Sequence, residues 1–188
     1  MLQLALYQPQ IPPNTGNCIR LAANLGATLH LIGPMGFDLD EKRVRRAGLD
    51  YKDMATVRVH EDFDTFCRSF DNTVCLEATS FEGSHAEKSG KSAPVRALRS
   101  VAERLVICTT KASKPHFEHR YTCDDILLFG SETSGLPPFI HELAGENRIR
   151  IPMVPESRSL NLSNSVAVIA YESVRQQHIA GMLSSPLV

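Results

Sequence analysis

Three polar segments, far apart along the chain, hold the side chains whose types and spacing could do chemistry. They are residues 12–20 (PPNTGNCIR), 128–137 (LFGSETSGLP) and 151–164 (IPMVPESRSLNLSN). Each follows an apolar, strand-like stretch and leads through Gly, Pro, Ser and Asn into a helix-like stretch. In an open α/β sheet, ligands bind in the loops beyond the carboxyl ends of the strands. The three segments therefore predict one shared ligand site.

The segment 128–137 has the composition of a loop that a ligand approaches closely. Gly130 follows a predicted strand and lets a ligand reach the backbone, while Glu132 and the hydroxyl residues beside it supply acceptors. Gly135 and Pro137 define the exit into the next helix. For this segment taken alone, an ordinary strand-to-helix turn with a solvated glutamate is the alternative.

The segment 151–164 combines a stiff backbone with many polar side chains. Pro152 and Pro155 follow a predicted strand and remove two N–H donors, so the remaining amides and carbonyls can serve a planar ligand. One side chain is needed to cap the next helix, but four hydroxyl or amide side chains fall within six positions: Ser159, Asn161, Ser163 and Asn164. This excess favours a functional site over capping alone.

The first segment places an arginine close to a polar turn. Pro12 and Pro13 predict an extended entry, Asn14 and Gly16 predict a turn, and Arg20 follows about one helical turn later. A planar guanidinium beside Asn and Gly suits recognition of a phosphate or carboxylate. A surface ion pair is the alternative for a lone arginine.

Composition limits the class of protein. The chain has 188 residues, is 43% hydrophobic and 22% charged, and carries a formal net charge of −1, which fits one soluble domain without a global basic field. An RNA partner would need a local patch; residues 42–46 (KRVRR) are a candidate, although nearby acidic residues favour a solvated helix face. No apolar run is long enough to span a membrane, and residues 1–7 lack the basic start of a signal peptide.

The cysteines and histidines predict neither disulfides nor a metal site. The five cysteines are odd in number and form no CxxC pair, which predicts buried free thiols and a reducing, cytoplasmic location. His116 and His119 lack partners at ligand spacing, so loop or surface positions and no metal are expected. The chain also lacks the GxxxxGKS/T and GxGxxG patterns, which argues against a nucleoside triphosphatase and a nicotinamide dehydrogenase.

Strand-like and helix-like stretches alternate, which predicts a mostly parallel α/β sheet with helices on both faces. The predicted strands are residues 2–7, 28–32, 73–76, 105–109, 126–129 and 148–151. The predicted helices are residues 16–25, 40–47, 61–70, 94–104, 138–143 and 163–177. Residues 79–93 are polar, rich in Ser and Gly and without periodicity, so they predict a mobile surface loop.

Taken together, the three segments resemble the motifs of the SPOUT superfamily of RNA methyltransferases, in the branch that methylates ribose 2′-hydroxyls. Residues 14–20 match the first motif, 129–137 the second and 151–164 the third. The resemblance covers residues 1–76 and 105–177, and it is strongest to the small tRNA (cytidine/uridine-2′-O-)-methyltransferases that modify the wobble nucleotide of leucine tRNAs. It implies methyl transfer to tRNA from S-adenosylmethionine, with S-adenosylhomocysteine as product and no metal.

The resemblance also implies an architecture. It implies one domain over residues 1–188 whose C-terminal part forms a deep trefoil knot, against the usual absence of knots in folds. Residues 77–104 are longer than in compact members and are expected to be a polar insertion. Members are homodimers in which the partner chain completes each site. Ser131 and Ser134 stand where relatives usually have Pro and Arg, so the RNA contact is expected to differ.

The resemblance further implies which residues touch the donor and the acceptor. S-adenosylmethionine is expected to contact Cys108, Thr109, Gly130, Glu132, Ile151, Met153, Ser159 and Leu160. The residues expected to act in catalysis are Arg20, Asn14, Glu132, Asn161 and Tyr171. The resemblance places Arg20 at the acceptor and implies that it acts as the base. Because a guanidinium is almost never deprotonated, the preferred role for Arg20 is to bind the adjoining phosphate and stabilise developing charge. Glu132 is the competing base, or it organises the loop or the donor.

Two other functions fit the same scaffold. One is 2′-O-methylation of another RNA such as rRNA, although the first predicted strand begins at Leu2, without the N-terminal RNA-binding extension that many such enzymes carry. The other is a non-catalytic RNA- or nucleotide-binding module. A pure binder would not need this whole set of residues together, which favours the enzyme: Asn14, Arg20, Glu132, Ser159 and Asn161.

Overall fold

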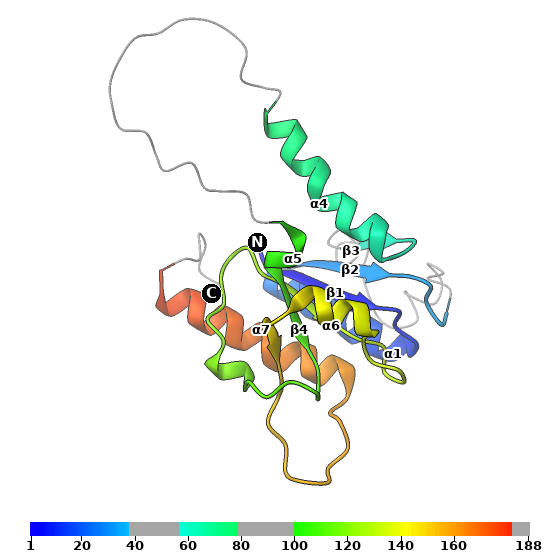
Figure 1. Cartoon of the computed structure of the whole chain (residues 1–188), viewed down its shortest axis with the longest axis vertical. Helices are drawn as coiled ribbons and strands as arrows, with labels where there is room; N and C mark the ends of the chain where they lie inside the picture. Colours follow the sequence, from blue (N-terminus) through cyan, green and yellow to red (C-terminus); the bar gives the residue numbers. More distant parts are fainter. Residues whose placement is uncertain (38–56, 79–99, 182–188) are drawn as a thin grey trace, which may run out of the picture.

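The strands form one parallel sheet in the middle of the molecule (Figure 1). The computed structural model describes residues 1–37, 57–78 and 100–181. The strand order is β3-β2-β1-β5-β4-β6, and every neighbouring pair is parallel. The strands are β1 (Gln3–Tyr7), β2 (Thr28–Ile32), β3 (Val57–His60), β4 (Leu105–Cys108), β5 (Ile126–Phe129) and β6 (Arg148–Ile149). The prediction of a parallel α/β sheet is confirmed.

Helices cover both faces of this sheet, as predicted. They are α1 (Pro12–Leu25), α4 (Phe63–Ala78), α5 (Val101–Arg104), α6 (Pro138–Ala144), α7 (Leu162–Ile179) and the short 3-10 helix η1 (His116–Glu118). Among the described residues, no helix is long and apolar enough to cross a membrane.

The central strands supply two hydrophobic clusters because successive side chains of a strand point to opposite faces. In β1, Leu4 and Leu6 belong to one cluster and Ala5 to the other. In β5, Phe129 belongs to the first cluster and Leu128 to the second. Burial on both sides explains why these strands are apolar at consecutive positions.

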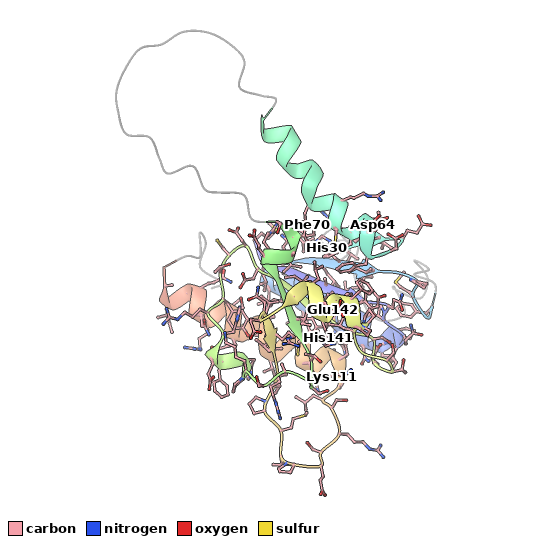
Figure 2. The ribbon with its side chains drawn as sticks, in the orientation of Figure 1. His30, Asp64, Phe70, Lys111, His141 and Glu142 are labelled. Atoms are coloured by element: carbon pink, nitrogen blue, oxygen red, sulfur yellow. The ribbon has the colours of Figure 1, made fainter. Side chains whose placement is uncertain are left out.

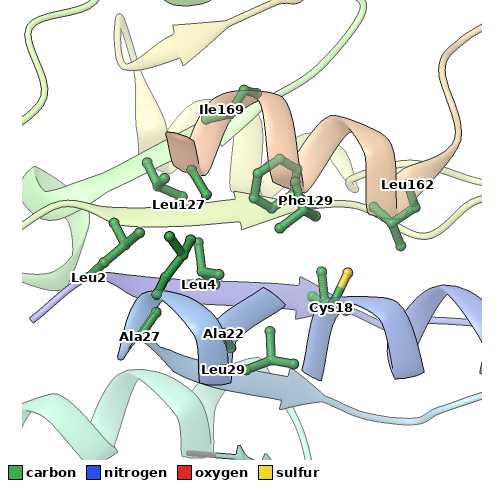
Figure 3. Packing of buried hydrophobic residues seen from close by; sticks show 14 of the residues in the cluster. Leu2, Leu4, Cys18, Ala22, Ala27, Leu29, Leu127, Phe129, Leu162 and Ile169 are labelled. Carbon is green, nitrogen blue, oxygen red and sulfur yellow. The ribbon is translucent and has the colours of Figure 1, made fainter. Parts of the chain in front are cut away.

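Helices α1 and α7 cover the first face. Cys18 and Ala22 of α1 and Ile169 of α7 pack with Leu4 and Phe129 from the sheet (Figure 3). Burial of each large apolar side chain, such as that of Leu4, Phe129 or Ile169, stabilises the folded state by roughly 1.5–3 kcal/mol. The packing holds the first turns of both helices against the carboxyl ends of the strands.

Helices α4, α5 and α6 cover the second face. Phe66 of α4, Val101 of α5 and Ile140 of α6 are buried in one cluster with residues of β4 and β5. This packing positions α6 beside the end of β4.

Helix α1 begins at Pro12, four residues before the predicted start. Pro12 and Pro13 occupy its first positions, where the missing N–H groups have no intrahelical partner to lose. The predicted turn at Asn14 is therefore wrong, and Asn14 lies in the first turn of the helix. The predicted end is confirmed, because Gly26 caps the helix in the left-handed conformation with φ 59°.

Two further element predictions are wrong. Residues 73–76, predicted to be a strand, lie within α4. The periodicity of so short an apolar run does not distinguish a strand from a segment of a helix. The strand β3 was not predicted, because its sequence VRVH exposes Arg58 and Val59 at the edge of the sheet.

Several predictions fall outside the described residues. These are the helix 40–47 with its basic cluster, the polar loop 79–93 and most of the predicted helix 94–104, of which the structure describes α5. The trefoil knot, the insertion at 77–104 and the single-domain organisation stay predictions of the family resemblance.

Candidate functional site

A pocket of about 490 Å³ opens at the carboxyl ends of β4 and β5. Its walls come from the loops after these two strands, from α6 and from the first turns of α1 and α7. The residues that line it are Ile11, Asn14, Cys108, Thr109, Thr110, Lys111, Phe129, Gly130, Ser131, Glu132, Thr133, Ser134, Gly135, Leu136, His141, Ser159, Leu160, Asn161, Leu162 and Ser165. Parallel strands that end at one edge explain why segments so distant in sequence meet there.

A chain of hydrogen bonds joins the three polar segments. Ser163 Oγ donates to Asn161 Oδ1 (2.8 Å). Asn161 Nδ2 donates to Asn14 Oδ1 (2.8 Å), and Asn14 Nδ2 donates to Glu132 Oε1 (2.9 Å). Asn161 also caps α7 by accepting from the N–H groups of Ser163 and Asn164. Because each amide uses both its donor and its acceptor, the chain fixes the orientation of Asn14 and Asn161.

Glu132 closes this chain at the N-terminus of α1. Its carboxylate accepts the N–H of Gln10 at 2.9 Å and that of Ile11 at 3.3 Å, besides the amide of Asn14. Burial raises the pKa of the Glu132 carboxyl, but these hydrogen bonds outweigh it and the pKa is lowered. A carboxylate held in this way is a weak base at neutral pH, so the geometry favours organisation of the loop over proton abstraction.

Two glycines shape the loop after β5. Gly135 has φ 69°, and its N–H and C=O pair with the C=O and N–H of Ser131 to close the loop. A Cβ on Gly130 would lie 2.4 Å from the carbonyl carbon of Gly135 and 2.7 Å from the nitrogen of Leu136. Glycine at 130 is therefore required by the backbone of the loop itself, as well as opening the pocket wall.

The pocket brings together most of the residues that the sequence singled out. Those that line it are Asn14, Cys108, Thr109, Gly130, Glu132, Ser159, Leu160 and Asn161. Burial raises the pKa of the Cys108 thiol to about 12, so Cys108 is a neutral wall residue and no nucleophile.

Four predicted site residues do not line this pocket. Ile151 and Met153 are half-buried in the segment that leads to α7, and Ile151 packs against the core. Arg20 is exposed on α1, and Tyr171 is 53% exposed on α7. Arg20 and Tyr171 thus lie on the surface of the same helix pair that covers one face of the sheet.

The sequence reasoning missed several pocket residues: Ile11, Thr110, Ser165 and the two titratable residues Lys111 and His141. Lys111 follows Thr109 and Thr110 at the end of β4, where its N–H donates to Thr109 Oγ1 at 3.2 Å. The argument that ligands bind at strand ends could have found it. His141 lies within α6 and has no comparable signal in the sequence.

The predictions for histidines and cysteines are confirmed in part. His119 lies in a loop, one of the two positions expected for it, and its side chain is buried 3.4 Å from Asp125 Oδ2. Cys18 is a buried free thiol as predicted, whereas Cys67, Cys108 and Cys123 are only half-buried. Over the residues that the structure describes, no group of three potential ligands could hold a metal ion.

Comparison with known proteins extends over nearly the whole chain. Residues 1–171 match the SpoU rRNA Methylase family. The chain is 47% identical over 184 residues to the tRNA (cytidine(34)-2′-O)-methyltransferase of Aeromonas hydrophila, covering 97% of this chain and 99% of that relative.

Solved structures show the same fold. A structure from a study of 2-OH methylation of C/U34 on tRNA superposes with a TM-score of 0.68 and 38% identity, covering 95% of this chain and 91% of that chain. A SpoU methyltransferase of Streptomyces viridochromogenes in complex with the cofactor AdoMet gives a TM-score of 0.68 and 26% identity, covering 95% of this chain and 58% of that chain. The chain therefore belongs to the SpoU methylase family.

Proposed function

We propose that this chain transfers a methyl group from S-adenosylmethionine to the ribose 2′-hydroxyl of the wobble nucleotide, a cytidine or modified uridine, of tRNA. The observation that carries the proposal is the hydrogen-bonded chain from Ser163 to Glu132, which joins the three family motifs beside one pocket. Relatives of nearly equal length that are named for position 34 of tRNA support the choice of substrate. Leucine tRNAs are the proposed species within that class.

The pocket fits S-adenosylmethionine in size and chemistry. Its volume of about 490 Å³ falls within the roughly 300–1,000 Å³ usual for small-molecule sites. Gly130 exposes backbone to the pocket, and Phe129 and Leu160 add apolar wall for an adenine ring. When bound, the cofactor supplies an electrophilic methyl group on a sulfonium.

The residues of the hydrogen-bonded chain position this site rather than react in it. Asn14 and Asn161 hold the first turns of α1 and α7 together, and Glu132 ties the loop after β5 to α1. Orientation of donor and acceptor can contribute roughly 7–11 kcal/mol to lowering the barrier of a displacement. Cys108, Thr109, Ser159 and Leu160 are proposed donor contacts, as are Ile151 and Met153 from the adjoining segment.

Arg20 and Tyr171 are proposed to act across a homodimer interface. Both are exposed and neither lines the pocket of its own chain, which suits a site that a partner chain completes. Arg20 would bind the phosphate next to the target ribose and stabilise negative charge as the hydroxyl oxygen attacks. The enzyme is proposed to work in the cytoplasm, where its tRNA substrate is made and used.

Action on rRNA is the weaker alternative. The curated relatives that match this chain almost end to end are named for position 34 of tRNA.

The test is transfer of labelled methyl from S-adenosylmethionine to rRNA and, separately, to total tRNA that lacks wobble 2′-O-methylation, followed by mapping of the labelled nucleotide. Label on the ribose of nucleotide 34 is the expected result. Label confined to rRNA, or none on any RNA while S-adenosylhomocysteine still binds, would overturn the proposal.

A further inference from the structure

The pocket has a second polar end that the three motifs do not explain. Lys111 follows β4 and His141 lies on α6, and both side chains line the pocket. Figure 2 shows the two residues one above the other, where α6 packs beside the end of β4. Neither residue belongs to the hydrogen-bonded chain that ends at Glu132.

Positive charge is concentrated at this end. Burial lowers the pKa of His141, the nearby charges of Lys111 and Arg148 lower it further, and a hydrogen bond with the Leu136 backbone acts in the opposite direction. Among the residues that the structure describes, no carboxylate forms an ion pair with Lys111 or Arg148.

The acidic groups around this end are engaged or exposed. Glu132 lines the pocket, but its oxygens accept from Asn14 and from the N-terminus of α1. Glu103 of α5, which packs on α6, accepts from the N–H of Ser100, and Arg104 of the same helix donates to the carbonyl of Asp124. Glu142 follows His141 on α6 and is exposed.

We propose that Lys111 and His141 form a subsite for an anionic group of a ligand, with Arg148 adding positive charge. The proposal rests on the proposed function, which offers two sources of such a group: the carboxylate of S-adenosylmethionine and a phosphate of the RNA. Lysine binds an anion as a point charge. A neutral imidazole keeps one ring nitrogen as an acceptor, so His141 can turn two donors toward its surroundings only after taking up a proton.

Occupation of the subsite therefore couples to protonation of His141. In the free protein the pKa of His141 lies below its ordinary value of 6.5, and the imidazole is neutral at neutral pH. An anion beside it raises that pKa. Between the free and bound pKa values, binding takes up a proton, so the affinity falls as pH rises, by up to about tenfold per pH unit.

The experiment measures binding to the full chain and to the variants Lys111→Ala and His141→Gln. The probes are S-adenosylhomocysteine, which carries the carboxylate, 5′-methylthioadenosine, which lacks the amino-acid moiety, and tRNA over a range of salt. The control is Arg68→Ala, which removes an exposed positive charge from α4 that lies outside the pocket. Circular dichroism checks that each variant keeps its fold.

For a carboxylate subsite, we expect Lys111→Ala to weaken binding of S-adenosylhomocysteine by about twofold to fivefold and to leave 5′-methylthioadenosine unchanged. Proton uptake, measured by calorimetry in buffers of different ionisation enthalpy, is expected for the wild type and is lost in His141→Gln. For a phosphate subsite, binding of both small molecules stays unchanged, and the salt dependence of tRNA binding becomes shallower by about one ion.

Two results would overturn the subsite. One is that both variants match Arg68→Ala with every probe. The other is that 5′-methylthioadenosine weakens as much as S-adenosylhomocysteine, which would mean that Lys111 and His141 only shape the pocket. If the wild type binds S-adenosylhomocysteine and the variants Lys111→Ala and His141→Gln bind every probe as tightly, the subsite is wrong but the proposed function stands. Failure of the wild type to bind S-adenosylhomocysteine and to methylate RNA would instead overturn the proposed function.

Discussion

The geometry of the pocket depends most directly on two asparagine side chains. Asn14 and Asn161 each donate once and accept at least once within one chain of hydrogen bonds. An aspartate at either position could not reproduce that pattern, because an ionised aspartate has no donor. The amides therefore fix how α1, α7 and the loop after β5 meet.

Glu132 is the residue at which positioning and proton abstraction can be told apart. In Glu132→Gln, one of the oxygens that accept from Gln10 and Ile11 becomes an NH₂ group, so a backbone N–H loses its acceptor. We expect the free energy of unfolding to fall by about 1–3 kcal/mol, together with weaker binding of S-adenosylhomocysteine. Urea unfolding and calorimetry provide the two measurements. A variant that keeps its stability and its donor affinity but has lost all turnover would instead identify Glu132 as the base.

Arg20 is expected to act on the acceptor and not on the donor. Because the guanidinium is exposed and outside the pocket, Arg20→Ala should lower single-turnover methyl transfer by about a hundredfold or more. Binding of S-adenosylhomocysteine should stay near the wild-type value. Arg68→Ala serves as the charge-matched control. Turnover near the wild-type rate in Arg20→Ala would eliminate both proposed roles of this residue.

At the scale of elements, the loop after β5 is a closed turn whose backbone leaves no room for a side chain at position 130. The pair of hydrogen bonds between Ser131 and Gly135 closes it, and Gly135 supplies the positive φ. The loop can therefore present Glu132 to α1 in one arrangement only.

Gly130→Ala is expected to disrupt this loop. The added Cβ would meet backbone atoms of Gly135 and Leu136, which cannot rotate away as a side chain can. We expect a loss of about 1–3 kcal/mol in the free energy of unfolding and weaker binding of S-adenosylhomocysteine. Ser113→Ala, at an exposed position that does not line the pocket, is the control. Wild-type stability and binding in Gly130→Ala would show that the loop relaxes more easily than its backbone contacts indicate.

At the scale of the whole molecule, a buried histidine pair links stability to pH. His30 of β2 lies 2.8 Å from His60 of β3 through Nδ1 and Nε2, and its Nε2 lies 2.9 Å from Gln3 Oε1. Phe66 and Phe70 surround the pair. Burial lowers the pKa of His30 from 6.5 to about 3, with further contributions from the charges of His60, Arg58 and Arg104.

This pair predicts a loss of stability on mild acidification. The unfolded chain binds a proton at His30 below about pH 6.5, whereas the folded chain does not until about pH 3. As far as His30 is concerned, the free energy of unfolding is therefore constant above about pH 6.5. Below that pH it falls by up to about 1.4 kcal/mol per pH unit for one proton. Urea unfolding at pH 7, 6 and 5 measures this loss of stability. Burial also lowers the pKa of His60, so protonation of His60 in the unfolded chain makes the dependence on pH steeper.

Glu132 acts in a lower pH window, which separates the two effects. The lowered pKa of the Glu132 carboxyl adds stability that is lost only as pH falls below 4.5, the ordinary pKa of a glutamate.

The prediction for His30 fails if the free energy of unfolding is equal at pH 7 and pH 5. That result would show that His30 is protonated in the folded protein at pH 5.

The sequence by itself determined the class of fold, the three motifs and most of the site. Alternation of apolar strands with helices predicts the parallel sheet, and the polar segments at strand ends predict the pocket that Asn14, Glu132 and Asn161 line. These features are local: they depend on periodicity and on the backbone preferences of Gly and Pro within a few residues.

Only the tertiary structure decided which of these residues touch and what else reaches the pocket. The bond between Asn161 and Asn14 spans 147 positions, and no local pattern encodes such a contact. His141 enters the site because α6 packs beside the end of β4. Contacts between distant segments follow from how complementary surfaces pack, which periodicity and turn residues within a few positions do not specify.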